Sequence, residues 1–74
     1  MKLPRNLPGT KVIKILIKHY NWEIYRREGS HVTLKKKNEM NIVTVPLHGS
    51  LLPGTFLSII RKANIDREDF LKKL

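Results

Sequence analysis

Residues 22–35 read WEIYRREGSHVTLK, and the fold that we predict is built outward from this stretch. In its second half Val32 and Leu34 alternate with polar side chains, and a period of two is typical of a strand with one buried face. The preceding run is rich in aromatic and β-branched residues, and Glu28-Gly29-Ser30 supplies a short turn between the two runs. The stretch therefore predicts an antiparallel β-hairpin.

The hairpin is expected to belong to a three-stranded sheet. We place its first strand at residues 22–27, with Trp22 and Ile24 facing the core, and its second at residues 31–35. A third strand follows at residues 41–45, where a β-branched run ends at a proline. Because the connecting turns are short, the three strands should form an antiparallel meander.

An amphipathic helix precedes the first strand and should end at Asn21, a residue type that tolerates the left-handed conformation. At about 100° per residue, five apolar side chains share one arc of this helix: Val12, Ile13, Leu16, Ile17 and Tyr20. Lysines at positions 11, 14 and 18 lie on the other side, and Ile15 is the one apolar residue that does not fit the pattern.

A second helical region begins at Pro53, and a short terminal helix follows Asp66, which is suited to cap it. The apolar stripe of the second helix consists of Phe56, Ile59, Ile60 and Ala63. The order helix–strand–strand–strand–helix predicts an α+β fold in which the helices pack on one face of the sheet and the other face stays open. Residues 1–74 are taken as a single domain, since no linker or repeat interrupts them.

The sequence is strongly basic and contains no cysteine. Fifteen Lys and Arg residues against six Asp and Glu residues give a net charge of +9, and most of the excess lies in residues 1–37. Such a field attracts polyanions, above all nucleic acid, although charge that only keeps a small protein soluble is the alternative. The lack of Cys excludes a disulfide scaffold, and the short apolar runs exclude a membrane span or membrane partner. We therefore expect a cytoplasmic protein.

The candidates for chemistry are three histidines, His19, His31 and His48. No two of them have the i, i+4 spacing of a helical metal site and no carboxylate accompanies them, so neither a metal nor another cofactor is expected. His48 leaves the third strand on the parity of Thr44, which allows it to share the open face of the sheet. Ser30 does not form a nucleophile–base pair with His31, because adjacent strand residues point to opposite faces.

His31 is the most informative of the three histidines. It alternates with Val32 and Leu34, so it should project from the open face of the sheet. Basic residues surround it in the sequence: Arg26, Arg27, Lys35, Lys36 and Lys37. Cleavage of RNA without a metal needs a base that takes the 2′-OH proton and cations that stabilise the phosphate. DNA lacks the 2′-OH and is not expected to be a substrate or, by itself, a partner.

Gly29-Ser30-His31, on a strand that follows a short amphipathic helix, resembles the signature of the HicA toxins, also called YcfA-like mRNA interferases. Further similarities follow in the family's order at residues 12–16, 45–48, 54–60 and 63–65. The resemblance covers nearly the whole chain, from about Leu3 to Leu71. It implies a double-stranded-RNA-binding-domain-like α-β-β-β-α fold, and a toxin that cleaves mRNA and is neutralised by a HicB-like antitoxin.

The resemblance assigns His31 as the catalytic residue, whereas the role of His48 stays open between an RNA contact and a structural position. Charge, position and resemblance together give the expected RNA-binding residues: Arg26, Arg27, Ser30, Lys35, Lys36, Lys37 and His48. Two departures from the family matter. Asn64 stands where Gly is usual, and residues 49–53 form an apolar loop where charged residues are usual, which hints at burial by a partner.

Two functions of different classes remain open at this point. The first is an endoribonuclease in which His31 is the general base. The alternative is a non-catalytic RNA-binding module, or a degenerate toxin that only binds its antitoxin. Loss of RNA cleavage in His31→Ala would support the first, and a small effect on binding alone would support the second.

Overall fold

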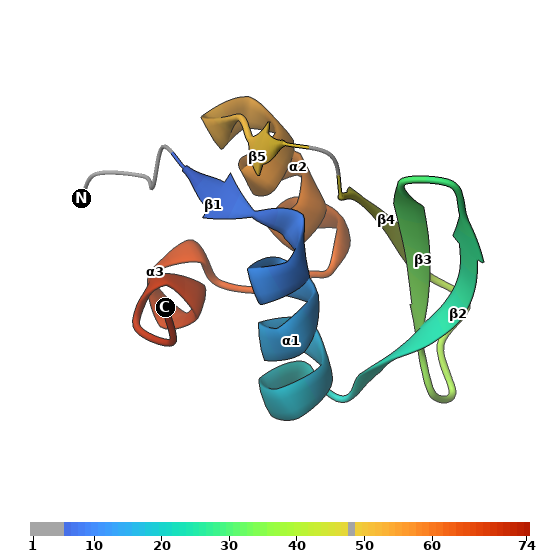
Figure 1. Ribbon diagram of the computed structural model, residues 1–74. Coiled ribbons are helices and arrows are strands. Elements are labelled where there is room, and N and C mark those ends of the chain that lie inside the picture. The colour runs from blue at the N-terminus through green and yellow to red at the C-terminus, as the bar shows by residue number, and fades with distance from the viewer. Residues whose placement is uncertain (1–5, 48) are drawn as a thin grey trace.

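A computed structural model describes residues 6–47 and 49–74, and Figure 1 shows how their helices and strands are arranged. In chain order the elements are β1 (Leu7–Pro8), α1 (Gly9–Tyr20), β2 (Trp22–Glu28), β3 (His31–Lys36), β4 (Ile42–Pro46), β5 (Ser50–Leu51), α2 (Pro53–Lys62) and α3 (Arg67–Leu71). An antiparallel sheet has the strand order β2-β3-β4, and the helices lie to one side of it. The predicted α+β fold and the three-stranded meander are confirmed, and the arrangement is compatible with a double-stranded-RNA-binding-domain-like description.

The core lies between the sheet and the helices. Alternate residues of β3 and β4 are buried: Val32, Leu34, Val43 and Val45. The largest fully buried side chains are Trp22, Phe56 and Phe70, which come from β2, α2 and α3. Because neighbouring strand residues point to opposite faces, the side chains that alternate with these four project from the side of the sheet without helices: His31, Thr33, Lys35, Ile42, Thr44 and Pro46.

Helix α1 is buried on two flanks, which corrects part of the predicted stripe. Ile15 is only 6% exposed, whereas Ile17, expected in the core, is 42% exposed. Figure 1 shows α1 between the sheet and α3, so the helix meets apolar neighbours on both sides. The sequence pattern predicts one apolar arc of α1. It contains no information about a second helix that packs against the other flank of α1.

Strand β2 is one of the two edge strands of this sheet, and its burial differs from the prediction at one residue. Trp22 is 2% exposed as expected, but Ile24 is 55% exposed. The pairing with β3 shifts register between Ile24 and Arg26, which leaves Tyr25 as an extra residue in a β-bulge. A bulge increases the local twist, and β2 curves away from the helices in Figure 1, so Ile24 has no helix above it.

Strands β1 and β5 form a small antiparallel pair that the sequence did not predict, with Leu7 opposite Leu51. Leu51 is 3% exposed and belongs to the core, although Leu52 beside it is 71% exposed. The apolar segment 49–53, for which we expected burial by a partner, therefore buries one of its two leucines within the chain itself. Strands of two residues are too short to show an alternating pattern.

Two asparagines end helices as the sequence predicted. Asn21 has φ 63° after α1 and Asn64 has φ 61° after α2, so both adopt the left-handed conformation. At the second site the Ile65 N–H donates to the Ile60 carbonyl at 2.9 Å, a bond that closes the end of α2. Asn64 therefore supplies the positive φ that a glycine would supply at this position.

Helix α3 is fixed to α1 by a polar cluster and by aromatic packing. The Tyr20 hydroxyl donates to the Asp69 carboxylate at 2.5 Å, and Lys73 Nζ contacts the same oxygen at 3.1 Å. These hydrogen bonds, first that of Tyr20 and then that of Lys73, hold the pKa of Asp69 below its ordinary value.

Phe70 lies 5.4 Å from Phe56 and 6.1 Å from Tyr20, measured between ring centroids. The expected cap, Asp66, accepts from the Asp69 N–H at 3.1 Å.

Candidate active site

The position of His31 is set by the turn between β2 and β3. Glu28 pairs with His31 across the hairpin, so Gly29 and Ser30 are the two central residues of the turn. Gly29 has φ 57°, and Ser30 is not among the residues with positive φ. Positive φ at the first central residue alone fits a type II′ turn, which matches the right-handed twist of paired strands. The glycine thus makes His31 the first residue of a regular strand.

His31 lies on the open face at one end of the sheet. It is exposed, it belongs to the same side of β3 as Thr33 and Lys35, and Pro46 of β4 lies opposite it. The Leu47 N–H donates to the Ser30 carbonyl at 2.6 Å, which ties the chain after β4 to the hairpin turn. The histidine is therefore held by backbone pairing on both sides, and its imidazole faces solvent without a helix over it.

The charged groups beside His31 are of both signs. Glu28 stands opposite His31, and Arg26 Nη2 lies 2.6 Å from Glu28 Oε1, with both side chains more than half exposed. Arg26 also pairs with Thr33, which places it on the open face with the histidine. An exposed ion pair of this kind contributes only about 0–1 kcal/mol, so an incoming phosphate can exchange with the carboxylate. Arg26 is the expected phosphate-binding cation that the register brings to this end of the sheet.

Two of the other expected cations face away from His31. Arg27 pairs with the buried Val32, and Lys36 pairs with the buried Trp22, so both lie on the helix side of the sheet. Sequence proximity suggested that they surround the histidine, but the bulge at Tyr25 and the alternation of β3 turn them to the opposite face.

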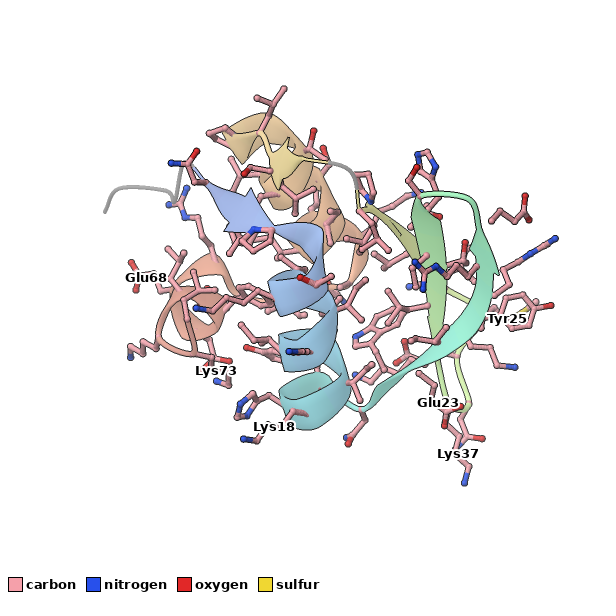
Figure 2. All side chains as sticks on the ribbon, in the orientation of Figure 1. Lys18, Glu23, Tyr25, Lys37, Glu68 and Lys73 are labelled. Carbon is pink, nitrogen blue, oxygen red and sulfur yellow. The ribbon has the colours of Figure 1, made fainter. Side chains whose placement is uncertain are left out.

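The remaining lysines lie at the far end of the sheet. Lys35 is four strand residues from His31, which is roughly 13 Å at about 3.3 Å per residue. Lys37 lies beyond β3, and Figure 2 shows it beside Glu23 at the end of the sheet opposite the hairpin turn. The open face therefore has two ends, which we call the histidine end, at His31 and the hairpin turn, and the lysine end, at Lys35 and Lys37.

Of the other expected site residues, Ser30 is exposed in the turn, and His48 lies outside the described residues. Among residues 6–47 and 49–74, no group of three His, Asp or Glu side chains has an arrangement that could hold a metal ion. In the same residues every helix is too short or too polar to cross a bilayer.

Sequence reasoning missed two residues of the open face. The first is Glu28, which the sequence placed in the turn but which is the last residue of β2 and pairs with His31, because the turn has only two central residues. The second is Tyr25, whose orientation depends on a bulge that no sequence pattern marks. Tyr25 is 56% exposed, and Lys35 Nζ lies 5.1 Å from the centre of its ring.

The fold and the site define a class: a small, basic α+β protein with an exposed histidine that follows a Gly-Ser turn on an open sheet. A family model described as the HicA toxin of bacterial toxin–antitoxin systems matches residues 9–65, which is well over half of the chain. The chain belongs to the HicA toxin family and is a toxin of a toxin–antitoxin system, in which HicB antitoxins are the family's partners. A search of curated proteins found no match.

Proposed function

We propose that this toxin is an endoribonuclease that cleaves mRNA without a metal, with His31 as the general base. The observation that carries the proposal is the position of His31, exposed on the open sheet face and fixed by strand pairing on both sides. The family's Gly-Ser-His signature falls on the turn that produces this position. HicB-like antitoxin is the proposed neutralising partner, and the cytoplasm, where mRNA is found, is the proposed location.

In the proposed reaction the His31 imidazole takes the proton of a ribose 2′-OH. The 2′-oxygen then bonds to the adjacent phosphorus while the bond from phosphorus to the 5′-oxygen breaks, and water supplies a proton to that oxygen. The products are a 2′,3′-cyclic phosphate and a 5′-OH. Lys35 lies roughly 13 Å away along β3, at the other end of the open face.

Arg26 is the proposed partner of the phosphate that is cut, because the hairpin register brings it to the histidine end of the open face. On binding, its guanidinium would exchange the Glu28 carboxylate for phosphate oxygens, with which it forms bidentate hydrogen bonds. Ser30, which lies in the turn, and His48 are proposed as further RNA contacts. Lys35 and Lys37 contact the RNA at a distance from the cut, whereas Arg27 and Lys36, which lie on the helix side, contact it only at the margin of the sheet.

The experiment compares an RNA with the DNA of the same sequence, each incubated with purified protein in EDTA. The proposal expects cleavage of the RNA alone, undiminished by EDTA, with 2′,3′-cyclic phosphate ends on the products. Cleavage that stops in EDTA, or products with 5′-phosphate ends, would contradict the mechanism.

The alternative class, a non-catalytic RNA binder or a degenerate toxin, is favoured by one observation. Glu23 and Glu28 pair with Lys35 and His31, so the open face carries carboxylates on both of its ends. Mixed charge suits a protein partner better than it suits a polyanion. Intact RNA after long incubation with protein that still binds an acidic HicB-like antitoxin would support this alternative.

A further inference from the structure

An exposed aromatic side chain stands on the open face between Arg26 and Lys35. Tyr25 occupies the bulge of β2, and bulges of edge strands often redirect a side chain. Figure 2 shows Tyr25 pointing away from the helices, and its ring is 56% exposed. No packing need of the core explains a large aromatic residue here, since the core lies on the other side of the sheet.

The surroundings of Tyr25 combine apolar surface with cations. Ile42, which pairs with Lys35 across the sheet, is 50% exposed, and Met40 in the following turn is 97% exposed. A hollow of about 340 Å³ adjoins them, lined by Glu23, Lys35, Lys36, Lys37, Asn38, Glu39 and Met40. Three ammonium groups against two carboxylates leave this hollow positive. An aromatic platform beside basic groups is the composition of sites that bind single-stranded nucleic acid.

We propose that Tyr25 and Lys35 form a nucleotide subsite, in which the Tyr25 ring stacks on a base and the lysine end of the face holds the adjoining phosphates. This inference rests on the proposed function and names its substrate as single-stranded RNA that extends several nucleotides beyond the cut. Lys35 Nζ lies over the ring at 5.1 Å, an exposed cation–π contact that is weak and exchangeable. The ammonium can therefore move to a phosphate while the base takes its place on the ring.

The separation from His31 fixes how long the substrate must be. Tyr25 lies between Arg26, which is opposite Thr33, and Ile24, which is opposite Leu34, so it is about three strand residues or ~10 Å from His31. This separation corresponds to about three stacked nucleotides at about 3.4 Å each, and to fewer when the strand is extended. Between the two ends, the hydroxyls of Thr33 and Thr44 lie 3.4 Å apart on the same face and offer hydrogen bonds to the backbone of the RNA. A stacked dinucleotide at the His31 end spans one step of about 3.4 Å and falls short of Tyr25.

The binding test uses a 2′-O-methyl octanucleotide, which cannot be cleaved, and measures its affinity by fluorescence anisotropy. Tyr25→Leu should weaken binding about tenfold, the usual scale of one base–aromatic stack, whereas Tyr25→Phe should keep most of the affinity. Ile24→Ala is the matched control, because Ile24 is the neighbouring residue on β2 with a nearly equal exposure of 55%. Circular dichroism checks that each variant keeps its fold. Equal affinities for wild type and Tyr25→Leu would overturn the inference.

The cleavage test compares an RNA octanucleotide with a dinucleotide. Tyr25→Leu should raise KM for the octanucleotide about tenfold, leave kcat unchanged and not affect the dinucleotide. An equal loss on both substrates, or weaker binding of a HicB-like antitoxin with unchanged RNA binding, would overturn the subsite. If wild type cleaves neither RNA but Tyr25 still governs binding of the octanucleotide, the proposed nuclease function fails and the subsite stands.

Discussion

Gly9→Ala is expected to destabilise the protein and to disturb the histidine end of the sheet. Gly9 is buried at the start of α1, and a Cβ on it would collide with the Pro46 carbonyl oxygen and lie 3.2 Å from Val45 Cγ1. The carbonyl is backbone and cannot move aside alone, so α1 and β4 must separate. Overpacking of this kind costs about 1–3 kcal/mol, which corresponds to a fall in Tm of about 4–8 °C for each kcal/mol in a domain of this size.

The matched control is Gly54→Ala in α2, where a Cβ would meet nothing within 4 Å. Because alanine reduces the entropy of the unfolded chain, this variant should be stabilised by about 0.4–1 kcal/mol. Thermal and urea unfolding followed by circular dichroism measure both variants. Since Pro46 pairs with His31, Gly9→Ala should also lower RNA cleavage at temperatures where it is still folded. A Tm for Gly9→Ala equal to or above that of wild type would refute the close approach of α1 to β4.

Three further perturbations test other parts of the structure. Asp69→Asn should lower Tm at pH 7 and flatten the dependence of Tm on acid. The pKa of Asp69 is lowered, first by the hydrogen bond of Tyr20, so its contribution to stability is present above about pH 4 and is lost as pH falls through the folded-state pKa. Thermal unfolding at pH values from about 7 to about 2.5 measures this effect. Phe70→Ala, at a fully buried position, should cost about 3–5 kcal/mol in urea unfolding, and a loss below 1 kcal/mol would contradict the packing of α3. Glu28→Gln should release Arg26 for phosphate, so that affinity for the octanucleotide rises. The plot of the logarithm of the binding constant against the logarithm of the salt concentration should steepen by about 0.7. An unchanged slope would place Arg26 outside the RNA interface.

The predictable part of the fold rests on local patterns. The alternation of Val32 and Leu34 marked a strand and its buried face, and Asn21 and Asn64 marked the ends of two helices. These signals depend only on neighbouring residues and on the conformational range of single residue types, so tertiary packing did not alter them.

The unpredictable part depends on contacts between distant segments. Ile15 is buried because α3 returns to α1, and Ile24 is exposed because a bulge turns the edge strand away from the helices. The same bulge decides that Tyr25 and Arg26 lie on the open face while Arg27 lies on the other. The sequence could thus identify His31 as the candidate base, but it could not separate the cations near it from those about 13 Å away along the strand.

The most direct test of the central claim is the rate of RNA cleavage by His31→Ala beside His19→Ala. His19 is an exposed histidine on α1, so its loss removes the same side chain from a surface without the hairpin turn. Removal of a general base lowers kcat/KM by about 10²–10⁴-fold. The account predicts a loss of this size in His31→Ala, with unchanged Tm and retained binding of the 2′-O-methyl octanucleotide, and a wild-type rate in His19→Ala. Cleavage by a folded His31→Ala protein within a few-fold of wild type would contradict it.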